Sequence, residues 1–102
     1  MSKDVVLLGR TETRMREVLA LLAPLIDVTL HPTLRETEAL ERIRSLPGLR
    51  VVLLGGAVDS PTRERLRAML ASERPDVVTN EPGVAYPYSD AGILDDARRK
   101  TR

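Results

Sequence analysis

The sequence predicts a small α/β domain in which helices cover both faces of a doubly wound parallel sheet of four strands in the order 2-1-3-4. Apolar runs of strand length alternate with amphipathic segments of about a dozen residues, which favours parallel strands joined by right-handed crossovers. The runs at 4–8 and 49–54 are almost unbroken, as in strands buried on both faces. The run at 25–30 instead alternates with polar residues, which is typical of an edge strand. With 102 residues, we expect residues 1–102 to form one domain.

The first strand is predicted over residues 4–8, DVVLL, and ends at Gly9. Thr11 is the expected N-cap of a helix over residues 11–23, which Pro24 ends. The apolar face of this helix comprises Met15, Val18, Leu19 and Leu22, spaced at i, i+3, i+4 and i+7.

The second strand is predicted over residues 25–30, because Ile26, Val28 and Leu30 alternate with polar residues. His31 and Pro32 are expected to end it. Thr33 and Glu36 then have the spacing of a capping box, which predicts a helix running to about Leu46. Its expected apolar face comprises Leu34, Leu40, Ile43 and Leu46.

The third strand is predicted over residues 49–54, with Arg50 as its only polar residue. Ser60 is the expected N-cap of the next helix, with Pro61 at the first helical position. The inward-facing residues of this helix are expected to be Leu66, Met69 and Leu70, and Pro75 ends it.

The fourth strand is predicted over residues 76–79, DVVT, and the following NEPGVAYPYSD reads as irregular. A last short helix is expected from Ser89 or Asp90. Asp95 with Arg99, and Asp96 with Lys100, stand at the stabilising i, i+4 spacing. The tail from about residue 98 is expected to fray.

Composition excludes several classes of function. A net charge of +1 does not favour nucleic acid as a partner. The absence of cysteine excludes disulfides, thiolate catalysis and cysteine metal sites, and a single histidine excludes a histidine-rich site. Tyr86 and Tyr88 are the only residues among Phe, Trp and Tyr, so a flavin or nucleobase ring would have little to stack upon. The sequence therefore implies no cofactor. No signal peptide or membrane-spanning segment is apparent, so we expect a cytoplasmic protein without a membrane partner.

A candidate site lies where the strand order reverses, between the first and third strands. Their predicted exits bring Gly9, Arg10 and Thr11 to the same crevice as Gly55 and Gly56, and Asp59 follows closely. Glycine admits a ligand close to the backbone, and a helix N-terminus with an arginine suits an anion such as phosphate or a carboxylate. The alternative is that the glycines only make tight turns, that Arg10 is solvated and that Thr11 is only a cap.

Known catalytic and nucleotide-binding fingerprints are absent. Residues 9–14 read GRTETR, which is neither a dinucleotide-binding glycine motif nor a P-loop, and Ser60 lacks a G-x-S-x-G context. His31 reads as an exposed turn residue, and a catalytic site is therefore not predicted.

Residues 4 to about 83 resemble the receiver domains of two-component response regulators, which have a flavodoxin-like, Rossmann-like fold. The segments VVLLG, RVVLLGGAVDSP and TNEPG resemble its first strand, its third strand with the following loop, and its late Lys-Pro turn. The resemblance implies strand order 2-1-3-4-5, an acidic magnesium-binding pair after the first strand and a phosphorylated aspartate after the third.

The sequence departs from that pattern at each of these functional positions. Gly9 and Arg10 replace the acidic pair, Gly55 replaces the phosphoacceptor aspartate, and Glu81 replaces the lysine before proline. The chain also lacks one β-α unit of the family. The resemblance therefore implies a degenerate, pseudo-receiver domain without aspartyl phosphotransfer.

These observations lead to three hypotheses of function. The first is a non-catalytic interaction domain that self-associates or binds a protein partner, with Tyr86 and Tyr88 as candidate interface residues. The second is a binder of a small anionic ligand, phosphate or a nucleotide, at the glycine-lined crevice. The third is an enzyme, for which only Asp59 and His31 are candidate ionisable groups.

Overall fold

A computed structural model describes residues 3–79 and 90–101, and within them a parallel sheet has the order β2-β1-β3-β4. The strands are β1 (Lys3–Leu8), β2 (Val28–Thr33), β3 (Leu49–Leu54) and β4 (Val78–Thr79). The helices are α1 (Glu12–Leu22), α2 (Glu36–Ser45), α3 (Ser60–Glu73) and α4 (Asp90–Lys100). The predicted fold class and strand order are confirmed. Tyr86, Tyr88 and the rest of the segment 80–89 lie outside the described residues.

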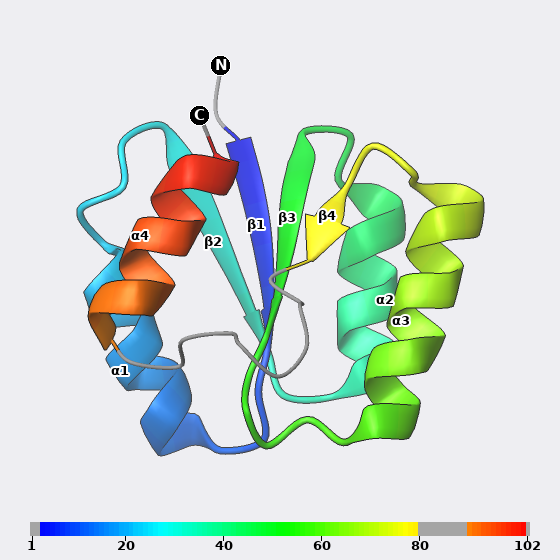
Figure 1. The fold of residues 1–102 in the computed structure, drawn as a ribbon, viewed down its shortest axis with the longest axis horizontal. Coiled ribbons are helices and arrows are strands. Elements are labelled where there is room, and N and C mark those ends of the chain that lie inside the picture. Colours follow the sequence, from blue (N-terminus) through cyan, green and yellow to red (C-terminus); the bar gives the residue numbers. More distant parts are fainter. Residues whose placement is uncertain (1–2, 80–89, 102) are drawn as a thin grey trace.

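Helices cover both faces of the sheet, with α1 and α4 on one side and α2 and α3 on the other (Figure 1). Successive side chains of β1 and β3 alternate between the two faces, as the pleat of a strand requires. Val5, Leu7, Val51 and Leu53 join the cluster under α1 and α4. Val6, Leu8, Val52 and Leu54 join the cluster under α2 and α3. Burial on both faces explains why the sequence of each central strand is almost continuously apolar.

The central strands β1 and β3 pair in parallel along most of their length. Their register runs from Val5 opposite Val51 to Leu8 opposite Leu54, with one irregularity between Asp4 and Val5. Because the strands run in the same direction, their carboxyl ends lie at the same edge of the sheet. This pairing confirms the adjacency on which the predicted crevice depends.

The second strand begins and ends three residues later than predicted, since it spans 28–33 rather than 25–30. The chain turns at Asp27, whose φ of 59° lies in the left-handed region, and this turn leaves Ile26 84% exposed. Pro32 belongs to the strand and does not end it. Proline is tolerated there because β2 is an edge strand, whose outer side needs no N–H donor.

The predicted capping box before α2 is wrong. Thr33 is the last residue of β2, and its Oγ1 donates a hydrogen bond of 2.6 Å to the Leu7 carbonyl oxygen. Arg35 occupies the N-cap position without a side-chain cap bond. Leu34 precedes the helix and packs with the α1 cluster, contrary to the prediction. The other predicted apolar residues, Leu40, Ile43 and Leu46, pack in the α2 and α3 cluster as expected, together with Ala39.

The boundaries of the next two elements also differ slightly from those predicted. Asp59, not Ser60, is the N-cap of α3, while Leu66 and Leu70 are buried as expected and Met69 is partly buried. Strand β4 pairs with β3 only through Val78 and Thr79, shorter than the expected run 76–79.

Helix α4 lies over the sheet beside α1, where Ile93 and Ala97 join the buried cluster. The expected pairs are present, with Asp96 2.8 Å from the Lys100 Nζ and Asp95 3.5 Å from the Arg99 Nε. Lys100 also donates to the carbonyl oxygen of Thr79 at 3.2 Å, which ties the helix to β4. The residues expected to form a frayed tail are helical through Lys100. Within the described ranges, no helix is long and apolar enough to cross a membrane.

Truncating a buried leucine of α3 tests this packing. Leu66 is fully buried under α3, so Leu66→Ala should lower the free energy of unfolding by about 2–5 kcal/mol. The exposed Ile26→Ala should change it by no more than about 0.5 kcal/mol. Urea unfolding followed by circular dichroism measures both values. Equal losses in the two variants would contradict the described core.

Candidate functional site

The exits of β1 and β3 touch each other through their glycines. The Gly55 N–H donates a 2.9 Å hydrogen bond to the Leu8 carbonyl oxygen, and the Gly9 N–H donates one of 3.1 Å to Thr33. A Cβ added at Gly55 would lie 3.4 Å from the Leu8 oxygen and 3.6 Å from the Gly9 Cα. A Cβ added at Gly9 would lie 3.1 Å from the Met15 Cε, closer than ordinary contact. Because glycine has no Cβ, the backbones of Gly9 and Gly55 can lie close to each other, and Met15 can lie close to Gly9.

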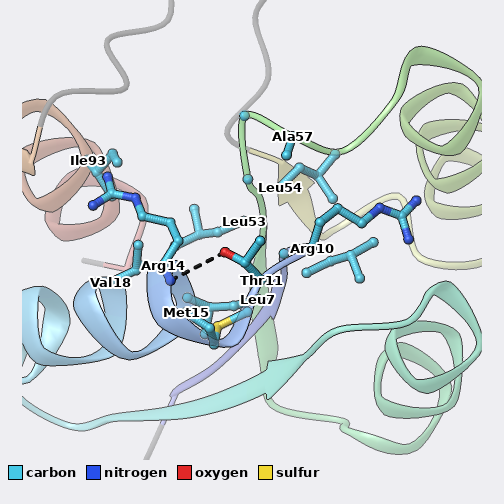
Figure 2. A pocket seen from close by; sticks show the side chains of 14 residues that line it. Leu7, Arg10, Thr11, Arg14, Met15, Val18, Leu53, Leu54, Ala57 and Ile93 are labelled. Atoms are coloured by element: carbon cyan, nitrogen blue, oxygen red, sulfur yellow. Dashed lines mark hydrogen bonds between the residues drawn. The ribbon is translucent and has the colours of Figure 1, made fainter.

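A cavity of about 300 Å³ opens at this edge, between the two strand exits, α1 and the start of α4 (Figure 2). Its lining comes from three parts of the chain, namely 7–18, 53–57 and Ile93. The residues are Leu7, Leu8, Gly9, Arg10, Thr11, Arg14, Met15, Val18, Leu53, Leu54, Gly55, Gly56, Ala57 and Ile93. Most of these side chains are aliphatic, so the cavity continues the core cluster of α1 and α4 toward the surface.

The structure brings most of the sequence-predicted site residues together. Gly9, Arg10, Thr11, Gly55 and Gly56 all line the cavity. Thr11 also acts as the predicted N-cap of α1, where its Oγ1 accepts a 3.4 Å hydrogen bond from the Arg14 N–H (Figure 2). Asp59 does not line the cavity, because it follows the β3 exit toward α3.

Although Arg10 lines the cavity, its guanidinium group points away from the cavity and toward α3. Its Nη2 lies 3.2 Å from the Asp59 Oδ1 and donates a 3.3 Å bond to the buried Thr62 Oγ1. Figure 2 shows the guanidinium groups of Arg10 and Arg14 pointing away from each other. Arg14 in turn lies 3.3 Å from Glu17 on the same helix. Each arginine at the cavity thus has a carboxylate partner.

The contacts of Arg10 extend into a wider network at this edge. Arg65 donates two hydrogen bonds to the Glu36 carboxylate, at 2.8 and 2.9 Å, and one of 3.2 Å to the Thr62 Oγ1. The Arg65 bonds lower the pKa of Glu36 below its ordinary value of 4.5. The Thr62 hydroxyl, with a smaller contribution from Arg10, lowers the pKa of Asp59. Both carboxylates therefore stay ionised at neutral pH.

Sequence analysis did not single out Arg63, which bonds to the loop between β3 and α3. Its Nε donates a 2.8 Å bond to the Val58 carbonyl oxygen, and its Nη2 donates to that of Gly55. One guanidinium therefore spans the loop between β3 and α3 and holds the glycine turn in place. An arginine at the fourth position of the helix that follows the loop is a weak sequence signal, because nothing local distinguishes it from a solvated one.

The reading of His31 as an exposed turn residue is wrong. It lies inside β2, its side chain is only 17% exposed, and its Nε2 is 2.9 Å from the Asp4 Oδ1. Asp59 lies instead at the strand exits with Arg10, so the structure does not join the two candidate catalytic groups.

The side chains at the strand exits include groups that could bind a ligand. The described cavity lining includes no carboxylate, histidine or serine. Across residues 3–79 and 90–101, no cluster of three or more histidine, aspartate or glutamate residues could hold a metal ion. The arrangement offers an apolar wall, exposed backbone at Gly56 and two arginines that already have partners.

Comparison with known proteins identifies the fold. Neither a protein-family model nor a curated protein matches the sequence. A solved structure from Pseudomonas fluorescens Pf-5, the signal receiver domain of an HD domain-containing protein, is similar with a TM-score of 0.73. The two chains are 20% identical, and the match covers 98% of this chain and 94% of that one. The chain therefore has a receiver-like, flavodoxin-like fold, as its resemblance implied.

The contact between Arg65 and Glu36 predicts a pH dependence that can be measured. A lowered pKa means that ionised Glu36 contributes stability above its unfolded pKa, and that this contribution disappears as the pH falls through the folded pKa. Arg65→Gln should return the pKa of Glu36 toward 4.5, as measured by carboxyl ¹³C NMR titration. The loss of folding stability at acidic pH should become smaller as a result.

A matched control is Arg44→Gln, which removes a similar arginine pair with Glu73 at 3.2 Å. It should leave the titration of Glu36 unchanged. If Glu36 titrates identically in Arg65→Gln and in the unmodified protein, the described network is wrong.

Proposed function

We propose that this chain is a receiver-like interaction domain that acts by binding protein surfaces and carries out no phosphoryl transfer. The observation that supports this most directly is the pair of adjoining glycines at the exits of β1 and β3. A phosphoacceptor and a metal site at this edge would need carboxylates there, and neither glycine has one.

The charge beside the glycines supports the same conclusion. Arg10 carries a permanent positive charge at the position where the receiver resemblance implies a magnesium ligand, and that charge repels a divalent cation. Its carboxylate neighbour, Asp59, is already paired with it at 3.2 Å. One paired carboxylate next to an arginine is a poor substitute for an acidic cluster.

Self-association is the form of interaction that the sheet edge favours. Strand β4 is the last strand of the described sheet and pairs through only two residues. Its Val78 is 46% exposed, one of two large hydrophobic side chains that stand out at the described surface. Edge strands present backbone groups for pairing with another chain, and an exposed apolar side chain adds contact area. We infer a homodimer formed along β4.

We test the proposed absence of phosphoryl transfer by exposing the protein to a small-molecule phosphoryl donor. After incubation with acetyl phosphate and Mg²⁺, intact-mass spectrometry should find no added phosphoryl group. A receiver domain with its phosphoacceptor aspartate, treated in parallel, provides the positive control. A phosphorylated species that hydroxylamine removes would contradict the proposal.

The dimer proposal is tested separately, by size-exclusion chromatography with light scattering at micromolar concentration. The unmodified chain should elute as a dimer, and Val78→Glu should shift it to monomer because a charge would be buried at the edge contact. Ile26→Glu is the matched control, since Ile26 is more exposed and lies in the turn before β2. A strict monomer, or equal effects of the two variants, would count against a β4 interface.

A further inference from the structure

The cavity at the strand exits has a wall that suits an apolar molecule. Leu7 of β1, Leu53 of β3, Met15 of α1 and Ile93 of α4 all belong to the buried cluster on this face of the sheet. Val18 of α1 packs against that cluster and also lines the cavity (Figure 2). A molecule that enters therefore meets aliphatic carbon from three sides and extends the existing core.

The charges around the cavity do not select for an anion. Arg10 pairs with Asp59 at 3.2 Å and Arg14 with Glu17 at 3.3 Å, so the rim carries paired rather than surplus charge. An entering phosphate would have to compete with these carboxylates. A neutral apolar molecule needs no such exchange, because its binding free energy comes from the surface it removes from water.

The size of the cavity narrows the class of ligand. Its volume is about 300 Å³, about twice the ~150 Å³ of an apolar protein cavity known to hold benzene. That volume is also at the lower end of the range for small-molecule pockets, which begins at about 300 Å³. The Met15 side chain at its wall has a flexible thioether that can adapt to the shape of a ligand.

We propose that this cavity binds a neutral, mainly apolar small molecule of about the size of two fused rings. The exposed backbone of Gly56 supplies a polar contact that would orient it. This inference does not depend on the interaction role proposed above, because Val78 does not line the cavity and the partner is of a different kind.

Indole is a suitable probe, because the chain has no tryptophan and indole fluorescence can be followed without a strong protein background. Titration should give saturable binding of one indole per chain. In ¹H–¹³C NMR spectra, the methyl signals of Met15 and Ile93 should shift with the same saturation curve. Inorganic phosphate should neither shift these signals nor displace indole.

Variants that fill the cavity locate the binding site. Val18→Phe should weaken indole binding at least about tenfold, while Leu21→Phe should not. Leu21 is the matched control because it lies on the same helix and packs against the same cluster without lining the cavity. Ala57→Leu fills the cavity from an exposed position, so it gives the same test if Val18→Phe does not fold.

Three results would overturn the proposal. They are the absence of saturable indole binding to the folded chain, equal binding by the cavity-filling variants and Leu21→Phe, and displacement of indole by phosphate. Without saturable binding, the cavity does not bind a small apolar molecule. Equal binding by the variants would mean that indole binds at another place, and displacement by phosphate would mean that the cavity binds anions.

Discussion

The parallel pairing of β1 with β3 is the constraint on which the rest of this structure depends. Both strands are buried on both faces, so neither can move to the sheet edge without exposing a row of aliphatic side chains. Their common direction brings both exits to one edge, where the Gly55 N–H donates to the Leu8 oxygen. The cavity, the turn held by Arg63 and the contacts of Arg10 all follow from that meeting point.

Charge and apolar surface are separated at this edge. Arg10 directs its guanidinium to the α2 and α3 side, where Thr62, Asp59, Arg65 and Glu36 form one network. The α1 and α4 side is left with aliphatic walls. This division is the basis on which we propose an apolar ligand at the cavity, and neither phosphotransfer nor anion binding at the strand exits.

Much of the fold could be predicted because the sequence patterns of the central strands reflect their burial directly. Two almost unbroken apolar runs predict β1 and β3, and the strand order predicts that Gly9 and Gly55 meet. The end of β2 could not be predicted, because Pro32 disrupts a central strand but is tolerated at an edge. The apolar character of the site was also missed, since it arises only when Ile93 of α4 packs near Val18 of α1, a contact between distant parts of the chain.

The most direct test of this account is an NMR measurement at the strand exits. If β1 and β3 pair as described, the amide proton of Gly55 should exchange slowly with solvent and show a nuclear Overhauser effect to the α protons of Gly9, because it donates to the carbonyl oxygen of Leu8. A rapidly exchanging Gly55 amide without that cross-strand contact would contradict the account. In that case the exits of β1 and β3 would not lie side by side, and the cavity between them would not exist.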